Sequence, residues 1–353
     1  MVVLGVDPHK QTHTVVAVDD NGKKLGCLTV PARGTGHLRL MKWAARFDGP
    51  RRWGIEDCRH VAGRLIDDLI RAGEQVVMVP PKLMARCRAS ARTRGKSDPI
   101  DALAVARAVL REPELPVAVL DPESLDVRLL LDHREDLVAE RTRRINRLRW
   151  HLVDLNPDLE PPTKTLNRLV TLRRLAAELA ELPASARRDI AIELVERILG
   201  DTVRINELER EIIAMVTPLA PALLALPGVA GLTAAKLIGE VAGVQRFRTS
   251  AQLAHLAGTA CIPVWTGNRE RHRLNRGGNR QLNAALHRIA VTQIRIHPPA
   301  RDLFDRRRSQ HADTKAGALR VLKRHLADVV FHAMNQDHRR RRTMSPTLQP
   351  LAA

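Results

Sequence analysis

The chain has 353 residues, enough for two domains with cores of their own, and 44% of them are hydrophobic, as in a globular protein. A net charge of +19 and a pI near 11.1 predict a polyanionic partner, with nucleic acid ahead of a membrane surface. Tyrosine is absent and aromatic residues make up 2%, which excludes a tyrosine nucleophile and disfavours base-stacking platforms, so we expect salt-sensitive phosphate contacts.

The first 111 residues alternate between strand and helix patterns. A turn of sequence Asp-Asn-Gly between two β-rich runs predicts a hairpin. Amphipathic spacing predicts two helices, the second closed by Gly73. A basic loop over 82–96 then leads into an Ala-rich helix. The expected strands cover 2–7, 13–18, 25–30, 51–57 and 75–80, and the two helices cover 36–47 and 61–73. This order predicts a mixed α/β sheet with helices on its faces.

Two aspartates, Asp98 and Asp101, stand where the Ala-rich helix begins. One explanation is helix capping, with Asp98 as the N-cap before Pro99 and Asp101 as a favourable first-turn charge. The other is metal binding, because residues three apart share one face of a helix. Asp7 and Glu56 end predicted strands, and strand ends at one sheet edge gather functional groups. Four converging carboxylates would repel without cations, so we favour a two-metal site for Mg²⁺, with Mn²⁺ as an alternative.

Three N-terminal segments carry a resemblance to a known family. "GVDPHK", "GIED" and "KSDPIDALAVA" resemble the blocks of the DEDD transposases of the insertion-sequence IS110 family in order and spacing. The resemblance implies an RNase H-like, RuvC-like N-terminal domain with Asp7, Glu56, Asp98 and Asp101 as catalytic metal ligands. "EDCRH" departs from the family pattern, which often has small residues after its glutamate.

The middle of the chain has apolar residues spaced by sevens. One seam runs through Leu131, Val138, Ile145 and Leu152, interrupted by Arg134 and Arg141, and a second run contains Ile198, Ile205 and Ile212. An ordinary two-helix hairpin within one chain explains this pattern, and so does a coiled-coil arm between protomers. The family resemblance favours the coiled-coil arm and a homo-oligomer.

The C-terminal region begins with "LALPGVAGLTAAKLIGEV", which resembles a helix-hairpin-helix unit. Gly228 and Gly231 there would let backbone amides approach a phosphate, unless the segment is simply a tight helix–helix turn. A loop over 263–279 is crowded with basic residues, and Gly277 and Gly278 then open a helix. We predict an anion cradle there, with a generic basic surface loop as the alternative. Its nucleic-acid-binding residues are Arg269, Arg271, Arg273, Arg276 and Arg280.

The same loop contains the step Thr266-Gly267. The resemblance implies a covalent serine nucleophile at this position, so Thr266 takes its place here. Threonine also offers a hydroxyl, although its methyl group crowds an in-line attack. A decayed copy of the element and another hydroxyl are the alternatives. Ser250 is the nearest serine, but it or Thr249 is expected to cap a helix, and His272 is a weak candidate base.

We therefore predict three domains: a RuvC-like domain over 1–122, a helical coiled-coil arm over 123–216, and a mainly α-helical transposase domain over 217–353 with a disordered basic end. The resemblance implies a recombinase that excises and inserts double-stranded DNA, guided by a bridge RNA. A Holliday-junction resolvase-like metal nuclease and a non-catalytic nucleic-acid-binding protein are the alternatives. The lack of a long apolar run and the four scattered cysteines predict no membrane association and a cytoplasmic location.

Overall fold

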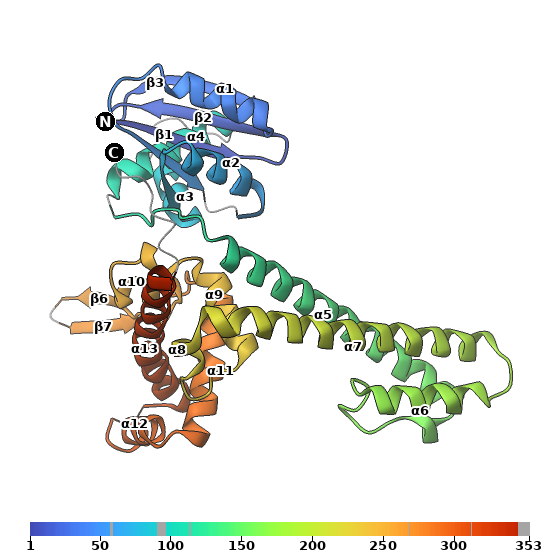
Figure 1. Cartoon of the computed structure of the whole chain (residues 1–353). Helices are drawn as coiled ribbons and strands as arrows, with labels where there is room; N and C mark the ends of the chain where they lie inside the picture. The colour runs from blue at the N-terminus through green and yellow to red at the C-terminus, as the bar shows by residue number, and fades with distance from the viewer. Residues whose placement is uncertain (57–58, 90–96, 113, 268, 312, 345–353) are drawn as a thin grey trace. The chain divides into compact units, whose positions relative to one another are not determined.

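The structure is a computed structural model that describes residues 1–56, 59–89, 97–112, 114–267, 269–311 and 313–344. The chain forms two compact units (Figure 1). Unit 1 comprises Met1–Asp121 and Gln245–Arg248, and unit 2 comprises Pro122–Val244 and Thr249–Ala353.

Unit 1 is built on a five-stranded mixed sheet with the strand order β3-β2-β1-β4-β5. β1, β2 and β3 are antiparallel neighbours, whereas β4 runs parallel to both β1 and β5. The strands span Val2–Pro8, Thr12–Val18, Lys24–Pro31, Arg51–Glu56 and Gln75–Val79. The predicted mixed sheet is confirmed, and so is the Asp-Asn-Gly turn: Asp19 accepts from the amides of Asn21 and Lys23, and Gly22 has a φ of 78°.

Helices cover both faces of this sheet. The helices α1 (Gly34–Ala44) and α2 (Arg59–Arg71) bury Leu40 and Leu65 in one cluster with Val2, Leu4 and Val6 of β1. On the other face lie α3 (Pro81–Ala89) and α4 (Asp98–Arg111), which pack Met84 and Val105 against Val3. The prediction of a basic loop over 82–96 is wrong for residues 82–89, and residues 90–96 lie outside the described part of the chain. Buried Met84 and Cys87, three residues apart, give α3 an apolar face despite its many arginines.

In unit 2, two long helices form an arm with a short helix at its far end (Figure 1). α5 (Pro122–Leu155) and α7 (Ala186–Leu219) run antiparallel, because Arg134 pairs with Glu209 and Arg144 with Asp201. The 3₁₀ turn η1 (Pro157–Leu159) and α6 (Leu169–Ala180) close the arm. Leu148 and Leu152 of α5 share a buried cluster with α6 and α7, so the predicted apolar seam is closed within one chain. The two arginines of the seam bond to α7, Arg134 to Glu209 and Arg141 to Thr202.

Among the described residues, the rest of unit 2 is helical apart from one hairpin. Its elements are α8 (Pro221–Leu224), α9 (Gly231–Val241), α10 (Ser250–Leu256), β6 (Ile262–Thr266), β7 (Arg269–Arg273), α11 (Arg280–Ile296), α12 (Pro298–Ser309) and α13 (Lys315–Met344). A further 3₁₀ turn, η2 (Val244–Arg246), begins at the last residue before the unit 1 segment Gln245–Arg248. The prediction of a disordered basic end is wrong up to Met344, because buried Asp337 accepts from the amides of Ala222 and Leu223 and Arg341 pairs with Glu123. Residues 345–353 lie outside the described part of the chain.

Candidate functional site: a carboxylate cluster and an arginine hairpin

The pairing of β1 with β4 brings Asp7 and Glu56 to neighbouring positions. The two strands are parallel, with Val6 opposite Ile55, so Asp7 and Glu56 each stand one residue further along. Val6 and Ile55 point into the core under α1 and α2. Side chains alternate along a strand, so Asp7 and Glu56 face the opposite side, which α3 and α4 cover. Both residues were predicted as strand-end carboxylates.

Two glycines let α4 lie directly on these strands. A Cβ atom on Gly5 would come within 2.2 Å of the Ala102 carbonyl oxygen and 2.3 Å of the Ala106 nitrogen. A Cβ atom on Gly54 would come within 2.3 Å of the Val109 side chain. Each glycine precedes its carboxylate by two residues and therefore lies on the same face of the sheet. The close approach brings the first turn of α4 to the edge where Asp7 and Glu56 stand.

The first turn of α4 carries Asp98 and Asp101, but neither is the N-cap. The N-cap is Ser97, with an extended backbone and no side-chain cap bond, and its carbonyl accepts from the Asp101 amide. Asp98 and Pro99 are the first two helical residues. The predicted capping role of Asp98 is therefore wrong, because the helix begins one residue earlier. Asp101 is buried and accepts a hydrogen bond of 2.8 Å from Arg88 of α3.

A histidine that the sequence analysis did not select, His9, lies between two of the carboxylates. Its Nε2 atom is 3.2 Å from Asp7 Oδ2 and 3.3 Å from Asp98 Oδ1. One ligand atom from each of Asp7, His9 and Asp98 fits within a span of 4.8 Å. The available signal was the spacing in "DPHK", where His9 follows Asp7 by two residues at the end of β1.

The electrostatics of this edge reflect the crowding of negative charge. Burial raises the pKa of Asp7 above its usual range, and the charges of Asp101 and Asp98 add to the rise while His9 opposes it. Hydrogen bonding and charge from Asp101 raise the pKa of Arg88, with further contributions from Glu56 and Asp7. Three of the four predicted carboxylates therefore raise the pKa of Arg88, and the fourth, Asp98, contacts His9. The buried Asp7 carboxylate, the partly exposed Asp98 carboxylate and the His9 nitrogen in this arrangement suit a divalent cation.

In unit 2, the predicted basic loop over 263–279 is instead a β-hairpin for most of its length. Register pairs Thr266 with Arg269, Val264 with Arg271 and Ile262 with Arg273. Partners in an antiparallel pair project to the same face, so Thr266 shares a face with Arg271 and Arg273. The Arg269 side chain lies outside the described residues. His272 is on the opposite face, 3.7 Å from Glu270, and is not placed to take a proton from Thr266.

The other predicted binding residues fall into separate places. Arg276 and Arg280 line a cavity near the base of the hairpin. Gly228 has a φ of 78° in the turn before α9, as a tight turn requires. A Cβ atom on Gly231 would come within 2.6 Å of Ile213 of α7, which explains this glycine by helix packing. Ser250 bonds to Asp328, while Thr249 caps α10 by accepting from the Gln252 amide.

Two transposase family models match different parts of this chain. Residues 4–157 match the family model of the IS110 DEDD transposases, described as a transposase, and residues 220–305 match that of the transposase IS116/IS110/IS902 family. Among the described residues, no helix is long and apolar enough to cross a membrane.

Full-length relatives come from three insertion elements. A 44.8 kDa protein of IS116 from Streptomyces clavuligerus is 28% identical over 95% of both chains. A 42 kDa protein of IS900 from Mycobacterium paratuberculosis is 25% identical over 96% of both. A 43.6 kDa protein of IS110 from Streptomyces coelicolor is 27% identical over 95% of this chain and 94% of the relative.

A solved structure of T. thermophilus RuvC in complex with a Holliday junction substrate is 18% identical and covers 31% of this chain and 95% of that one, with a TM-score of 0.25, too low to establish a shared fold. The ranges matched by the two family models include the four N-terminal carboxylates and the arginine hairpin. The chain belongs to the IS110 family of insertion-sequence transposases.

Proposed function

We propose that this transposase cuts and rejoins double-stranded DNA as a site-directed recombinase, with Asp7, Glu56, Asp98 and Asp101 as ligands for divalent metal ions. One observation carries the proposal: β1, β4 and the first turn of α4 bring acidic side chains to one sheet edge, where Asp7 is buried and its pKa is raised. Such a concentration of negative charge is unfavourable without a cation.

Carboxylate oxygens suit Mg²⁺ best, and Mn²⁺ accepts the same ligands. Bound ions would supply charge stabilisation at the attacked phosphate and at the oxygens that are activated and expelled. The chain's own residues hold the site in shape. Arg88 fixes the Asp101 carboxylate through its hydrogen bond, and Gly5 and Gly54 keep α4 against the sheet. His9 contacts Asp7 and Asp98 and completes the polar surroundings of the edge.

We assign the covalent step to Thr266. Its Oγ1 atom attacks the phosphorus of a DNA phosphodiester, so that a new O–P bond joins the protein to one strand end. The O–P bond to the neighbouring sugar breaks, and that sugar oxygen leaves as a hydroxyl with a proton. The Thr266 hydroxyl gives up its own proton, and rejoining is the reverse of these steps.

The hairpin supports this assignment in two ways. Thr266 is exposed, as an attacking group on a macromolecular substrate must be. Arg271 and Arg273 lie on its face of the hairpin and would stabilise the charge that develops on the phosphoryl oxygens. The methyl group of threonine restricts χ1, which predicts slower attack than from serine at the same position.

The resemblance also implies partners. A guide RNA would supply the choice of DNA sites, and the carboxylates of one protomer would meet the hairpin of another in a homo-oligomer. Within unit 2 the apolar seam between α5 and α7 is already buried. Assembly of protomers would therefore use other surfaces than that seam.

Strand cleavage in the presence and absence of metal tests the proposal. We expect the full chain to cleave duplex DNA that contains the ends of its element in Mg²⁺ and to lose this activity in EDTA. Asp101→Asn, which removes a negative ligand, should be inactive, whereas Asp20→Asn in the exposed β2–β3 turn should retain activity. Full activity in EDTA would exclude the metal site.

A further inference from the structure

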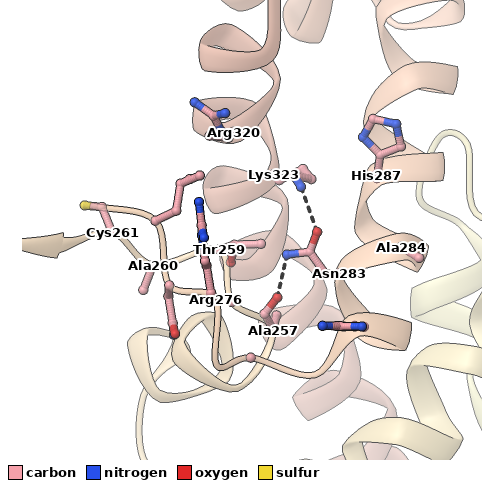
Figure 2. A pocket seen from close by; sticks show the side chains of 15 residues that line it. Ala257, Thr259, Ala260, Cys261, Arg276, Asn283, Ala284, His287, Arg320 and Lys323 are labelled. Atoms are coloured by element: carbon pink, nitrogen blue, oxygen red, sulfur yellow. Dashed lines mark hydrogen bonds between the residues drawn. The ribbon is translucent and has the colours of Figure 1, made fainter. Parts of the chain in front are cut away.

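A cavity of about 610 Å³ lies in unit 2 at the base of the β6–β7 hairpin (Figure 2). Its walls come from the segment after α10, the loop before α11, and the helices α11 and α13. Figure 2 shows Lys323 and Arg320 on one helix, Asn283 and His287 on a second, and Arg276 on the loop. Segments far apart in the sequence therefore build one hollow, which no local motif could indicate.

The lining of this cavity carries positive charge without a compensating carboxylate. Its cations are Arg276, Arg280, Arg320 and Lys323. Aspartate and glutamate do not occur in the lining, and within the described ranges none of these four side chains forms an ion pair. On α13, by contrast with Arg320 and Lys323, the neighbouring Arg324 does form an ion pair, with Asp328. Four unpaired cations around one hollow predict an anionic ligand.

Lys323 is the least exposed of these cations. It is half-buried, and its Nζ atom donates to Asn283 Oδ1 at 2.8 Å. Asn283 is itself fixed, because its Nδ2 atom donates to the Ala257 carbonyl at 2.7 Å. Burial, with a further contribution from Arg320, lowers the pKa of Lys323. A bound anion would relieve both effects, because it restores a favourable partner to a desolvated ammonium group.

The wall opposite α13 depends on two glycines in contact. A Cβ atom on Gly278 would come within 2.3 Å of the Gly258 Cα atom. The loop that carries Arg276 can therefore lie directly against the segment after α10. Arg276, Arg280 and Arg320 are exposed around the half-buried Lys323. A polymer chain could therefore pass along the exposed arginines while one of its anionic groups enters the cavity and reaches Lys323.

We propose that this cavity binds one phosphodiester group of duplex DNA, with Lys323 contacting the phosphate and Arg320, Arg276 and Arg280 holding its flanks. The proposal rests on the proposed function, which makes DNA the substrate. The lining has no aromatic side chain other than His287, so a base-stacking nucleotide or single-stranded RNA site fits it less well.

The strand β6 connects the cavity to Thr266 and limits the distance between them. Cys261 lines the cavity, and β6 begins at the next residue and ends at Thr266. At roughly 3.3 Å per residue, the two positions are at most about 17 Å apart along the strand. At a rise of roughly 3.4 Å per base pair along the helix axis, that span covers at most about five base pairs of a duplex. The cavity would thus position the DNA a few nucleotides from the attacked phosphate.

Binding of a labelled 20-base-pair DNA duplex to the full chain, measured by fluorescence anisotropy in EDTA at several salt concentrations, tests the proposal. We expect Arg320→Gln/Lys323→Gln to weaken affinity about tenfold and to reduce the salt slope by about 2, because two phosphate contacts are lost. Lys323→Arg should stay within threefold of the wild type. Arg339→Gln, an exposed cation elsewhere on α13, should stay within twofold.

Several results would overturn the proposal. The proposal is wrong if the double variant binds DNA with the affinity and salt slope of the wild type. It is also wrong if Arg339→Gln loses as much DNA affinity as the double variant. A loss confined to a 20-base-pair RNA duplex would assign the cavity to RNA instead. If the double variant does not fold, Arg320→Gln alone, which alters an exposed side chain, should weaken affinity about threefold and lower the slope by about 1.

A second readout reports occupancy directly. Alkylation of Cys261, followed by mass spectrometry of its peptide, should slow when DNA is bound, while alkylation of exposed Cys27 should not. Equal alkylation with and without DNA would contradict occupancy of the cavity. Because these measurements are made in EDTA, they do not depend on cleavage. A wild type that binds as described but never cleaves DNA would contradict the proposed function alone.

Discussion

The carboxylates of unit 1 stand on a buried sheet with a helix packed onto it, whereas Thr266 of unit 2 stands on a two-stranded hairpin that is largely exposed. The first arrangement fixes each group through packing: two glycines seat α4 and Arg88 holds Asp101. The second leaves its side chains accessible to a large substrate. A metal site needs fixed ligands, and a group that attacks DNA needs access, so the two regions suit their proposed roles differently.

The comparison predicts that variants in the two regions fail in different ways. Asp7→Asn should reduce strand cleavage by about a thousandfold, because several kcal/mol of charge stabilisation are lost, but should leave DNA affinity within twofold. Arg271→Gln/Arg273→Gln should instead weaken affinity about tenfold, with a smaller salt slope. Cleavage assays and anisotropy on the same preparations separate the two effects. Equal loss of affinity in both variants would remove the distinction.

Packing at Gly5 gives the next largest effect. Gly5→Ala should lower the free energy of unfolding by about 3 kcal/mol, since the new methyl group meets backbone atoms of α4 that cannot move independently. Cleavage should fall too, because α4 carries Asp98 and Asp101. The matched control is Gly63→Ala in α2, where no atom lies within 4 Å of the added Cβ and stability should not fall. Urea unfolding measures both. Equal stability of the two variants would show that the contact does not constrain α4.

Acid should destabilise unit 1 through His13. Burial, with the nearby charge of His37, lowers the pKa of His13 to about 4. Since the unfolded chain binds the proton near pH 6.5, stability is full above that pH and falls as pH drops toward 4. We expect a loss of about 2 kcal/mol between pH 7.5 and 5.

The His13→Leu variant should lack this part of the pH dependence, and His311→Gln, at an exposed position, should retain it. Urea unfolding curves at the two pH values give the comparison. A His13→Leu variant with undiminished acid sensitivity would assign the effect to other groups.

The smallest effect is expected at the hairpin tip. Gly267 has a φ of 57° and no atom near an added Cβ. Gly267→Asn should change the free energy of unfolding by less than about 0.5 kcal/mol, because asparagine tolerates this conformation. Thermal unfolding of the variant measures this change. A loss above about 1 kcal/mol would show that the hairpin is packed as tightly as the sheet.

Much of unit 1 could be predicted from local patterns. The β-branched runs and the Asp-Asn-Gly turn indicated all five strands, and the mixed sheet is confirmed. The helix α3 was missed because its basic composition resembles a loop, and its buried Met84 and Cys87 gain meaning only beside α4. His9 was missed because the two carboxylates that it contacts are 91 residues apart in the chain, and only the fold brings them together.

In unit 2, local sequence patterns did not predict the hairpin, the cavity or the partner of the apolar seam. The density of arginines over 263–279 led to the prediction of an anion-binding loop and not of a hairpin, because β7 is made of charged residues with low strand propensity and its pairing with β6 decides the structure. The cavity joins Ala257, Arg276, Asn283 and Lys323 from four segments, so no spacing in the sequence marks it. The heptad pattern predicted helices correctly, but the partner of the seam was the same chain.

Trapping of a covalent protein–DNA adduct is the most direct test, because the proposed function requires Thr266 to form a bond to DNA. A resolvase-like nuclease would form no such adduct. We predict that the wild type forms the adduct in Mg²⁺, that Thr266→Ala forms none while it still binds DNA, and that Thr266→Ser forms at least as much. Ser250→Ala should resemble the wild type, since Ser250 bonds to Asp328. An adduct that persists in Thr266→Ala, or disappears in Ser250→Ala alone, would contradict the assignment.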